Sequence, residues 1–167
     1  PWAAILVMTS VVSIQALIFQ DGGLLVLGAN ILNMGIIGVL VSYMVYRTVR
    51  RLLGDRPWSI FAGGFLAAWA SIEIAALAVA LQLALSGTSP ANIAVPAMAA
   101  IHAVIGIGEG LITVGALAFL YAARRDLVQA GDAPAKAGKL VWAGGLVVAI
   151  ALAVLSPLAS SNPDGLE

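Results

Sequence analysis

Residues Ile101–Thr113 read Ile-His-Ala-Val-Ile-Gly-Ile-Gly-Glu-Gly-Leu-Ile-Thr, and this stretch predicts a membrane-spanning helix. It lies in an apolar run from about Ala91 to Tyr121, longer than the ~20 residues needed to cross a bilayer. Its ionisable residues, His102 and Glu109, are seven positions apart, so a helix places both on one face, roughly 10 Å apart. Because imidazole and carboxyl groups are costly at membrane depth, we expect that face to meet a packed interior or a wet cavity.

The composition of the whole chain supports the same assignment. Of 167 residues, 62% are hydrophobic and 10% are charged, whereas soluble domains carry about 25% charged residues. The chain is therefore predicted to be an integral membrane protein whose surroundings are the lipid bilayer. Eight basic residues balance eight acidic ones and form no aromatic-interleaved basic patch, so no nucleic-acid partner is predicted. The absence of cysteine excludes disulfides, thiolate metal sites and cysteine nucleophiles.

Working outward from the opening stretch, the sequence predicts an all-α, polytopic transmembrane bundle. Strands are not expected, because the apolar runs are long and do not alternate with polar residues. We predict five membrane-spanning helices, at Trp2–Phe19, Leu24–Tyr46, Trp58–Leu85, Ala91–Tyr121 and Leu140–Leu155.

The positions of the basic residues predict the orientation of this bundle. All eight Lys and Arg residues lie in two loops, Arg47–Arg56 and Arg124–Lys139. Successive spans alternate in direction, so both loops lie on one side of the membrane. Cytoplasmic loops are enriched in Lys and Arg. We therefore expect a multi-pass protein of the plasma membrane, with both basic loops cytoplasmic and with Ser86–Pro90 and the C-terminal tail external.

Polar residues inside the spans are candidates for a functional site. His102 and Glu109 could line a site or pathway for a divalent cation, since imidazole and carboxylate are suitable ligands. The alternative is that each satisfies a backbone carbonyl or a hydroxyl where helices pack. Glu73, on the neighbouring span, could be a relay, a partner for His102 or a structural hydrogen-bonding group.

Two asparagines near the outer end of the second span form a second candidate pair. Asn30 and Asn33 are three residues apart and so neighbour each other on a helix face. Their amide oxygens could contact a substrate or orient its ligands. Alternatively, Asn30 caps the helix that follows Gly28.

The glycines of the opening stretch predict helix packing rather than nucleotide binding. Gly106, Gly108 and Gly110 form Gly-x-Gly-x-Gly, but no strand precedes them as a dinucleotide fold requires. Gly106 and Gly110 are spaced to admit a close neighbouring helix. The sequence contains no catalytic-triad arrangement, His-Glu-x-x-His motif or phosphate-binding Gly-x-x-x-x-Gly-Lys-Ser/Thr loop, so we do not expect an enzyme.

Two stretches of the chain carry a family resemblance. Asp21–Gly38, with Asp-Gly-Gly-Leu-Leu-Val-Leu-Gly-Ala-Asn-Ile-Leu-Asn-Met-Gly-Ile-Ile-Gly, resembles a signature of the CbiM/NikM family, and so does His102–Thr113. These proteins are membrane-embedded substrate-capture subunits of energy-coupling-factor transporters for cobalt and nickel. The likeness covers about Pro1–Arg125. Ser156–Glu167, with its Pro-Asp-Gly-Leu, resembles part of a small accessory subunit that is sometimes fused behind the capture subunit.

The resemblance implies a modular protein. Residues 1–126 would be the transmembrane metal-capture module and 127–139 a cytoplasmic linker. Residues 140–167 would be an accessory-subunit-like segment with one transmembrane helix and an external tail. The partners would be a transmembrane coupling subunit, called T, and cytoplasmic ATPases, with Ni²⁺ or Co²⁺ as the transported ligand and no cofactor. The runner-up interpretations are a capture subunit for an organic nutrient such as a vitamin and a non-transporting membrane scaffold.

The resemblance also implies where the metal ligands are. In this family a Met-His start and a further histidine hold the metal, and both would precede Pro1. We therefore expect the sequence to be a fragment that lacks these ligands and does not bind metal normally. His102, Glu109, Asn30 and Asn33 are carried over as residues that line or brace the site.

Overall fold

The computed structural model describes residues 1–20, 22–125 and 128, and within them every regular element is a helix. Helix α1 covers Trp2–Ile18. One continuous helical run then comprises α2 (Leu27–Asn30), the π-helix η1 (Ile31–Ile37) and α3 (Gly38–Leu53). Helices α4 (Pro57–Leu85) and α5 (Ala91–Ala123) follow.

These helices account for most of the predicted spans. The α2–η1–α3 run, α4 and α5 have 27, 29 and 33 residues and are apolar enough to cross a membrane. Helix α1 is equally apolar, but its 17 residues give a length of only about 25 Å, less than the ~30 Å of a typical hydrocarbon core. The predicted fifth span, Leu140–Leu155, lies outside the described residues. The structure thus supports an all-helical membrane protein with three full-length candidate spans, and the number five stays a prediction.

The helix ends follow from local sequence. Pro57 occupies the first turn of α4, where its missing N–H costs nothing. The helix ends in a Schellman motif: the Thr88 N–H donates to the Leu83 carbonyl at 3.0 Å and the Gly87 N–H to the Ala84 carbonyl at 3.2 Å. Gly87 has φ +73°, a left-handed conformation that glycine adopts without strain. The short external loop predicted at Ser86–Pro90 is therefore a tight turn between α4 and α5.

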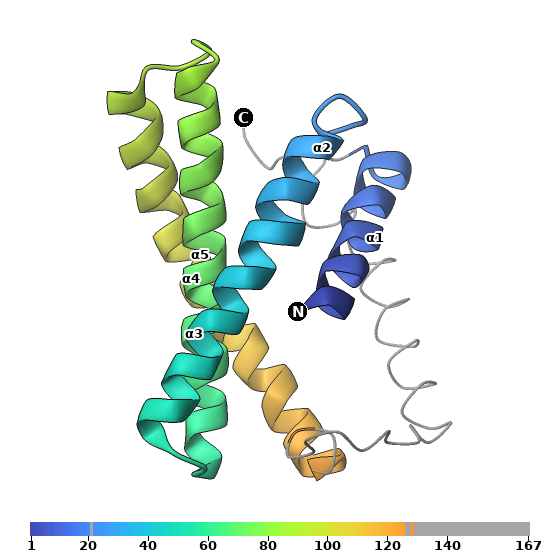
Figure 1. Ribbon diagram of the computed structural model, residues 1–167, viewed down its shortest axis with the longest axis vertical. Coiled ribbons are helices and arrows are strands. Elements are labelled where there is room, and N and C mark those ends of the chain that lie inside the picture. The colour runs from blue at the N-terminus through green and yellow to red at the C-terminus, as the bar shows by residue number, and fades with distance from the viewer. Residues whose placement is uncertain (21, 126–127, 129–167) are drawn as a thin grey trace.

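Helix α4 is the centre of the bundle. It lies antiparallel to α5, while the α2–η1–α3 run crosses it and α1 packs beside the upper part of that run (Figure 1). Most of its buried residues are small, because backbones can approach closely only where side chains are small. The buried positions of α4 are Ser59, Ile60, Gly63, Gly64, Ala67, Ala75, Ala76 and Ala80.

The α4–α5 contact confirms the packing interpretation of Gly106 and Gly110. A Cβ on Gly110 would lie 2.7 Å from the ring of Phe65, and one on Gly106 would lie 2.9 Å from both Trp69 and Ile72. The Trp69 Nε1–H also donates to the Ala103 carbonyl at 3.0 Å, which fixes the indole against α5. Large α4 side chains therefore occupy the space on the α5 surface that is left by the missing side chains of these glycines.

This contact gives a matched stability prediction. Gly110→Val should lower the free energy of unfolding by about 1–3 kcal/mol, the usual cost of overpacking, because the Phe65 ring occupies the space. Gly108→Val is the control: it makes the same change two residues away, where nothing lies within 4 Å of a new Cβ. Unfolding midpoints in detergent measure both. Equal midpoints would show that the α4–α5 contact is not packed as described.

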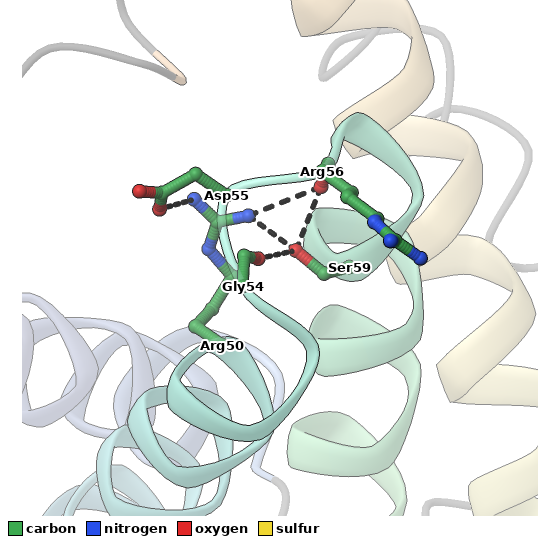
Figure 2. Close-up of polar contacts among 5 residues, drawn as sticks. All are labelled: Arg50, Gly54, Asp55, Arg56 and Ser59. Atoms are coloured by element: carbon green, nitrogen blue, oxygen red, sulfur yellow. Dashed lines mark hydrogen bonds and ion pairs between the residues drawn. The ribbon is translucent and has the colours of Figure 1, made fainter.

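A polar network closes the turn between α3 and α4 (Figure 2). The buried Ser59 hydroxyl lies 2.7 Å from the carbonyl oxygens of both Gly54 and Arg56. Arg50 donates to Ser59 and to the Arg56 carbonyl, and it forms an ion pair of 3.3 Å with Asp55. The turn is thus held by its own side chains, at the same end of the bundle as the last residues of α5.

Candidate functional site

Glu109 lies near the middle of α5 and borders a cavity of about 360 Å³ between α1, the η1–α3 run, α4 and α5. Most of the lining is apolar. Glu109 is an exposed residue, and it shares the cavity lining with Ser42 and Ser71 and with Met8 and Met34. Each serine hydroxyl already donates to a carbonyl of its own helix. All of these side chains are possible cation ligands or hydrogen-bonding groups, although the methionine thioethers favour softer metals. The full lining is Ala4, Met8, Met34, Gly38, Val39, Ser42, Ser71, Ile72, Ala75 and Glu109.

His102 is half-buried and is not one of the residues that line this cavity. Its Nδ1 lies 2.8 Å from the Met98 carbonyl oxygen on the preceding turn. A carbonyl oxygen can only accept, so Nδ1–H is the donor in this bond. Metal-binding histidines are commonly oriented by such a bond to a carbonyl. The bond equally fits the packing alternative, in which His102 satisfies only a backbone group.

Asn33 is 1% exposed and forms a reciprocal amide pair with Gln82 of α4. The Asn33 Nδ2–H donates to Gln82 Oε1 at 3.0 Å, and the Gln82 Nε2–H donates to Asn33 Oδ1 at 2.8 Å. The pair joins α4 to the π-helix η1, and π-helical segments frequently occur at functional sites. Asn33 is thus engaged with α4, and Gln82 is a polar residue that the sequence reasoning missed.

Asn30 does not share this role. Helix α2 begins at Leu27, and the Asn30 side chain makes no capping hydrogen bond, so the N-cap alternative is wrong. Instead the Asn30 amide lies against the turn after α1, where a Cβ on Gly22 would be 2.8 Å from Asn30 Nδ2. The two asparagines therefore contact different elements, although they are three residues apart on one helical run.

Glu73 has one buried carboxylate oxygen, Oε2, without a hydrogen-bond partner among the described residues. No hydrogen bond or ion pair joins it to His102 in the described part of the chain, which removes support for a direct pairing. Within the same residues, no three His, Cys, Asp or Glu side chains come close enough to hold a metal ion. The described residues therefore contain no complete coordination shell of these ligand types.

The Asn33–Gln82 pair gives a double-mutant prediction. Asn33→Leu and Gln82→Leu should each lower stability, because each leaves the other amide unpaired in an apolar setting. The double variant should recover part of the loss, with a coupling of about 0.6–2 kcal/mol. Unfolding of all four proteins in the same detergent measures this coupling. Strictly additive losses would mean that the two amides are not paired in solution.

Comparison with known proteins places these helices in one family model. Residues 1–127 match the model described as CbiM, the cobalt uptake substrate-specific transmembrane region. The match includes all the described helices and every candidate site residue.

Relatives with assigned names agree with that match. The chain is 38% identical to a putative fused nickel transport protein NikMN of Archaeoglobus fulgidus, over 95% of this chain and 50% of that protein. It is 36% identical to the fused nickel transport protein NikMN of Rhodobacter capsulatus, over 95% and 49%. It is 37% identical to the cobalt transport protein CbiM of Sorangium cellulosum, over 77% and 58%. The chain thus spans about half the length of these relatives, and no solved structure matches it.

Proposed function

Because the chain belongs to the CbiM family of cobalt uptake transmembrane proteins, we propose that it is the substrate-capture component of an ATP-driven energy-coupling-factor system that imports Ni²⁺ or Co²⁺. The observation that carries the proposal is the family match over residues 1–127, joined by relatives named for nickel and for cobalt transport. The relatives do not separate the two metals, and imidazole ligands accept both. The substrate class is therefore Ni²⁺ or Co²⁺.

The geometry supports a bracing role for the polar residues of the spans. Glu109 would place a carboxylate at the cavity between α1, the η1–α3 run, α4 and α5. His102, nearer the outer end of α5, would orient metal ligands contributed by another part of the protein. Asn33 would act through Gln82 by keeping η1 against α4. Asn30 would support the turn that follows α1.

We place the energy-coupling step in other subunits. It contains no Gly-x-x-x-x-Gly-Lys-Ser/Thr loop to cradle phosphates. Cytoplasmic ATPase partners would hydrolyse ATP, and a transmembrane coupling subunit would transmit the resulting movement. In this proposal residues 1–126 capture the metal, while 127–139 link them to the accessory-like segment 140–167.

Uptake in cells tests this assignment. Cells that lack their own nickel and cobalt importers would express the natural full-length protein with its coupling and ATPase partners. We expect chelator-sensitive accumulation of radiolabelled Ni²⁺ or Co²⁺, which a phosphate-loop lysine substitution in the ATPase abolishes. Accumulation of a radiolabelled vitamin instead would support the organic-nutrient alternative, and no accumulation of either would support a scaffold.

A further inference from the structure

The α3–α4 turn presents two guanidinium groups that its internal network does not use. Arg50 is engaged with Ser59 and forms an ion pair with Asp55. Arg51 and Arg56 are exposed. The Arg56 side chain points away from the Arg50 cluster (Figure 2). The turn therefore carries two positive charges without a carboxylate partner among the described residues.

These charges border a shallow hollow of about 660 Å³ that is also lined by apolar side chains. Leu52 and Trp58 lie in its wall and are 79% and 48% exposed. Asp55 also borders the hollow, but it is paired with Arg50. The hollow thus combines two free guanidinium groups with an exposed leucine and an exposed indole.

Two tyrosine–arginine pairs at this end of the bundle are typical of a membrane interface. On α3, the Arg47 Nη1–H donates to the Tyr43 hydroxyl at 3.1 Å, and the guanidinium carbon lies 5.9 Å from the ring centre. At the end of α5, the Arg125 guanidinium carbon lies 4.5 Å from the Tyr121 ring centre. In each pair the arginine is one turn beyond the tyrosine, the order expected where aromatic rings lie at headgroup level and arginines extend towards water.

We propose that the hollow formed by Arg51, Leu52, Arg56 and Trp58 binds the phosphate headgroup of an anionic phospholipid. Guanidinium groups bind phosphate through paired N–H donors, and basic pockets between membrane helices are typical sites for anionic lipids. Leu52 and Trp58 contact the glycerol and upper acyl region. An acidic protein segment would match the charges, but it would not account for the exposed apolar side chains beside them.

Native mass spectrometry of the full chain in detergent, with added phosphatidylglycerol or phosphatidylcholine, tests the site. We expect selective retention of phosphatidylglycerol. R51Q/R56Q should weaken that binding roughly 10–30-fold, since each basic residue near a membrane surface contributes about fivefold. R51K/R56K keeps the charges but loses the paired donors. Its affinity for phosphatidylglycerol should therefore lie between that of the unmodified chain and that of R51Q/R56Q. Glycerophosphoglycerol, the headgroup without acyl chains, should compete poorly because it cannot contact Leu52 and Trp58.

R47Q/R125Q is the matched control, because it removes the same charge from arginines that are packed on tyrosines. It should retain phosphatidylglycerol binding at the turn. Equal retention of the two lipids by the unmodified chain would overturn the proposal and favour an acidic protein partner. Equal losses in R51Q/R56Q and R47Q/R125Q would overturn it in favour of diffuse attraction. If glycerophosphoglycerol competes as strongly as the intact lipid, the hollow binds phosphate without using Leu52 and Trp58, and the lipid proposal is overturned.

Discussion

In the natural full-length protein, His102→Ala is expected to weaken metal uptake about 10–100-fold, the usual loss when a residue that orients a metal ligand is removed. The amount of protein in the membrane should not change, because among the described residues the half-buried ring bonds only to a carbonyl of its own helix. Uptake of radiolabelled Ni²⁺ and Co²⁺ as a function of concentration, normalised to membrane protein level, measures the effect.

Glu109→Gln belongs to the same experiment and separates charge from shape. Glutamine keeps the size and polarity of glutamate at the cavity, so a loss of uptake would assign the role to the carboxylate charge. Ser86→Ala is the control. Ser86 is exposed in the turn that precedes α5, whereas Glu109 lies near the middle of that helix. Unchanged uptake by both His102→Ala and Glu109→Gln would leave only the packing interpretation of Ile101–Thr113.

The second large effect concerns the orientation of the protein in the membrane. A cysteine on the outer side is labelled in intact cells by an impermeant thiol reagent, whereas one on the inner side is not. These 167 residues contain no cysteine, so the labelling of a single introduced cysteine has no background from this part of the protein. An impermeant thiol reagent applied to intact cells should label Thr88→Cys in the α4–α5 turn. It should not label Asp55→Cys, whose side chain is fully exposed in the α3–α4 turn, until the cells are opened. The reverse pattern would mean that the segregation of Lys and Arg was misinterpreted.

Much of the helical layout could be predicted because it depends on long apolar runs. The predicted Trp58–Leu85 differs from α4 by one residue, and the predicted Trp2–Phe19 differs from α1 by one. The second span was misplaced at both ends. It begins only at Leu27, and it continues past Tyr46 to Leu53 because arginines are good helix formers whose side chains can reach water.

The polar contacts could be predicted less well, since they depend on how helices are rotated against one another. The spacing of Gly106 and Gly110 indicated a close helix, and the structure places Phe65, Trp69 and Ile72 there. By contrast, nothing local to Asn33 shows that Gln82, 49 residues away, would be its partner. The π-helix η1 was also not foreseen, because its hydrogen-bond register depends on packing against α1 and α4 as well as on its own residues.

The most direct test of the central claim is equilibrium binding of radiolabelled Ni²⁺ to the purified, natural full-length protein in nanodiscs. We expect saturable binding of one ion per protein for Ni²⁺, or for radiolabelled Co²⁺ in the same assay, which a chelator removes and which is weaker in His102→Ala. Absence of saturable binding of both metals by well-folded protein would contradict a role in capturing Ni²⁺ or Co²⁺.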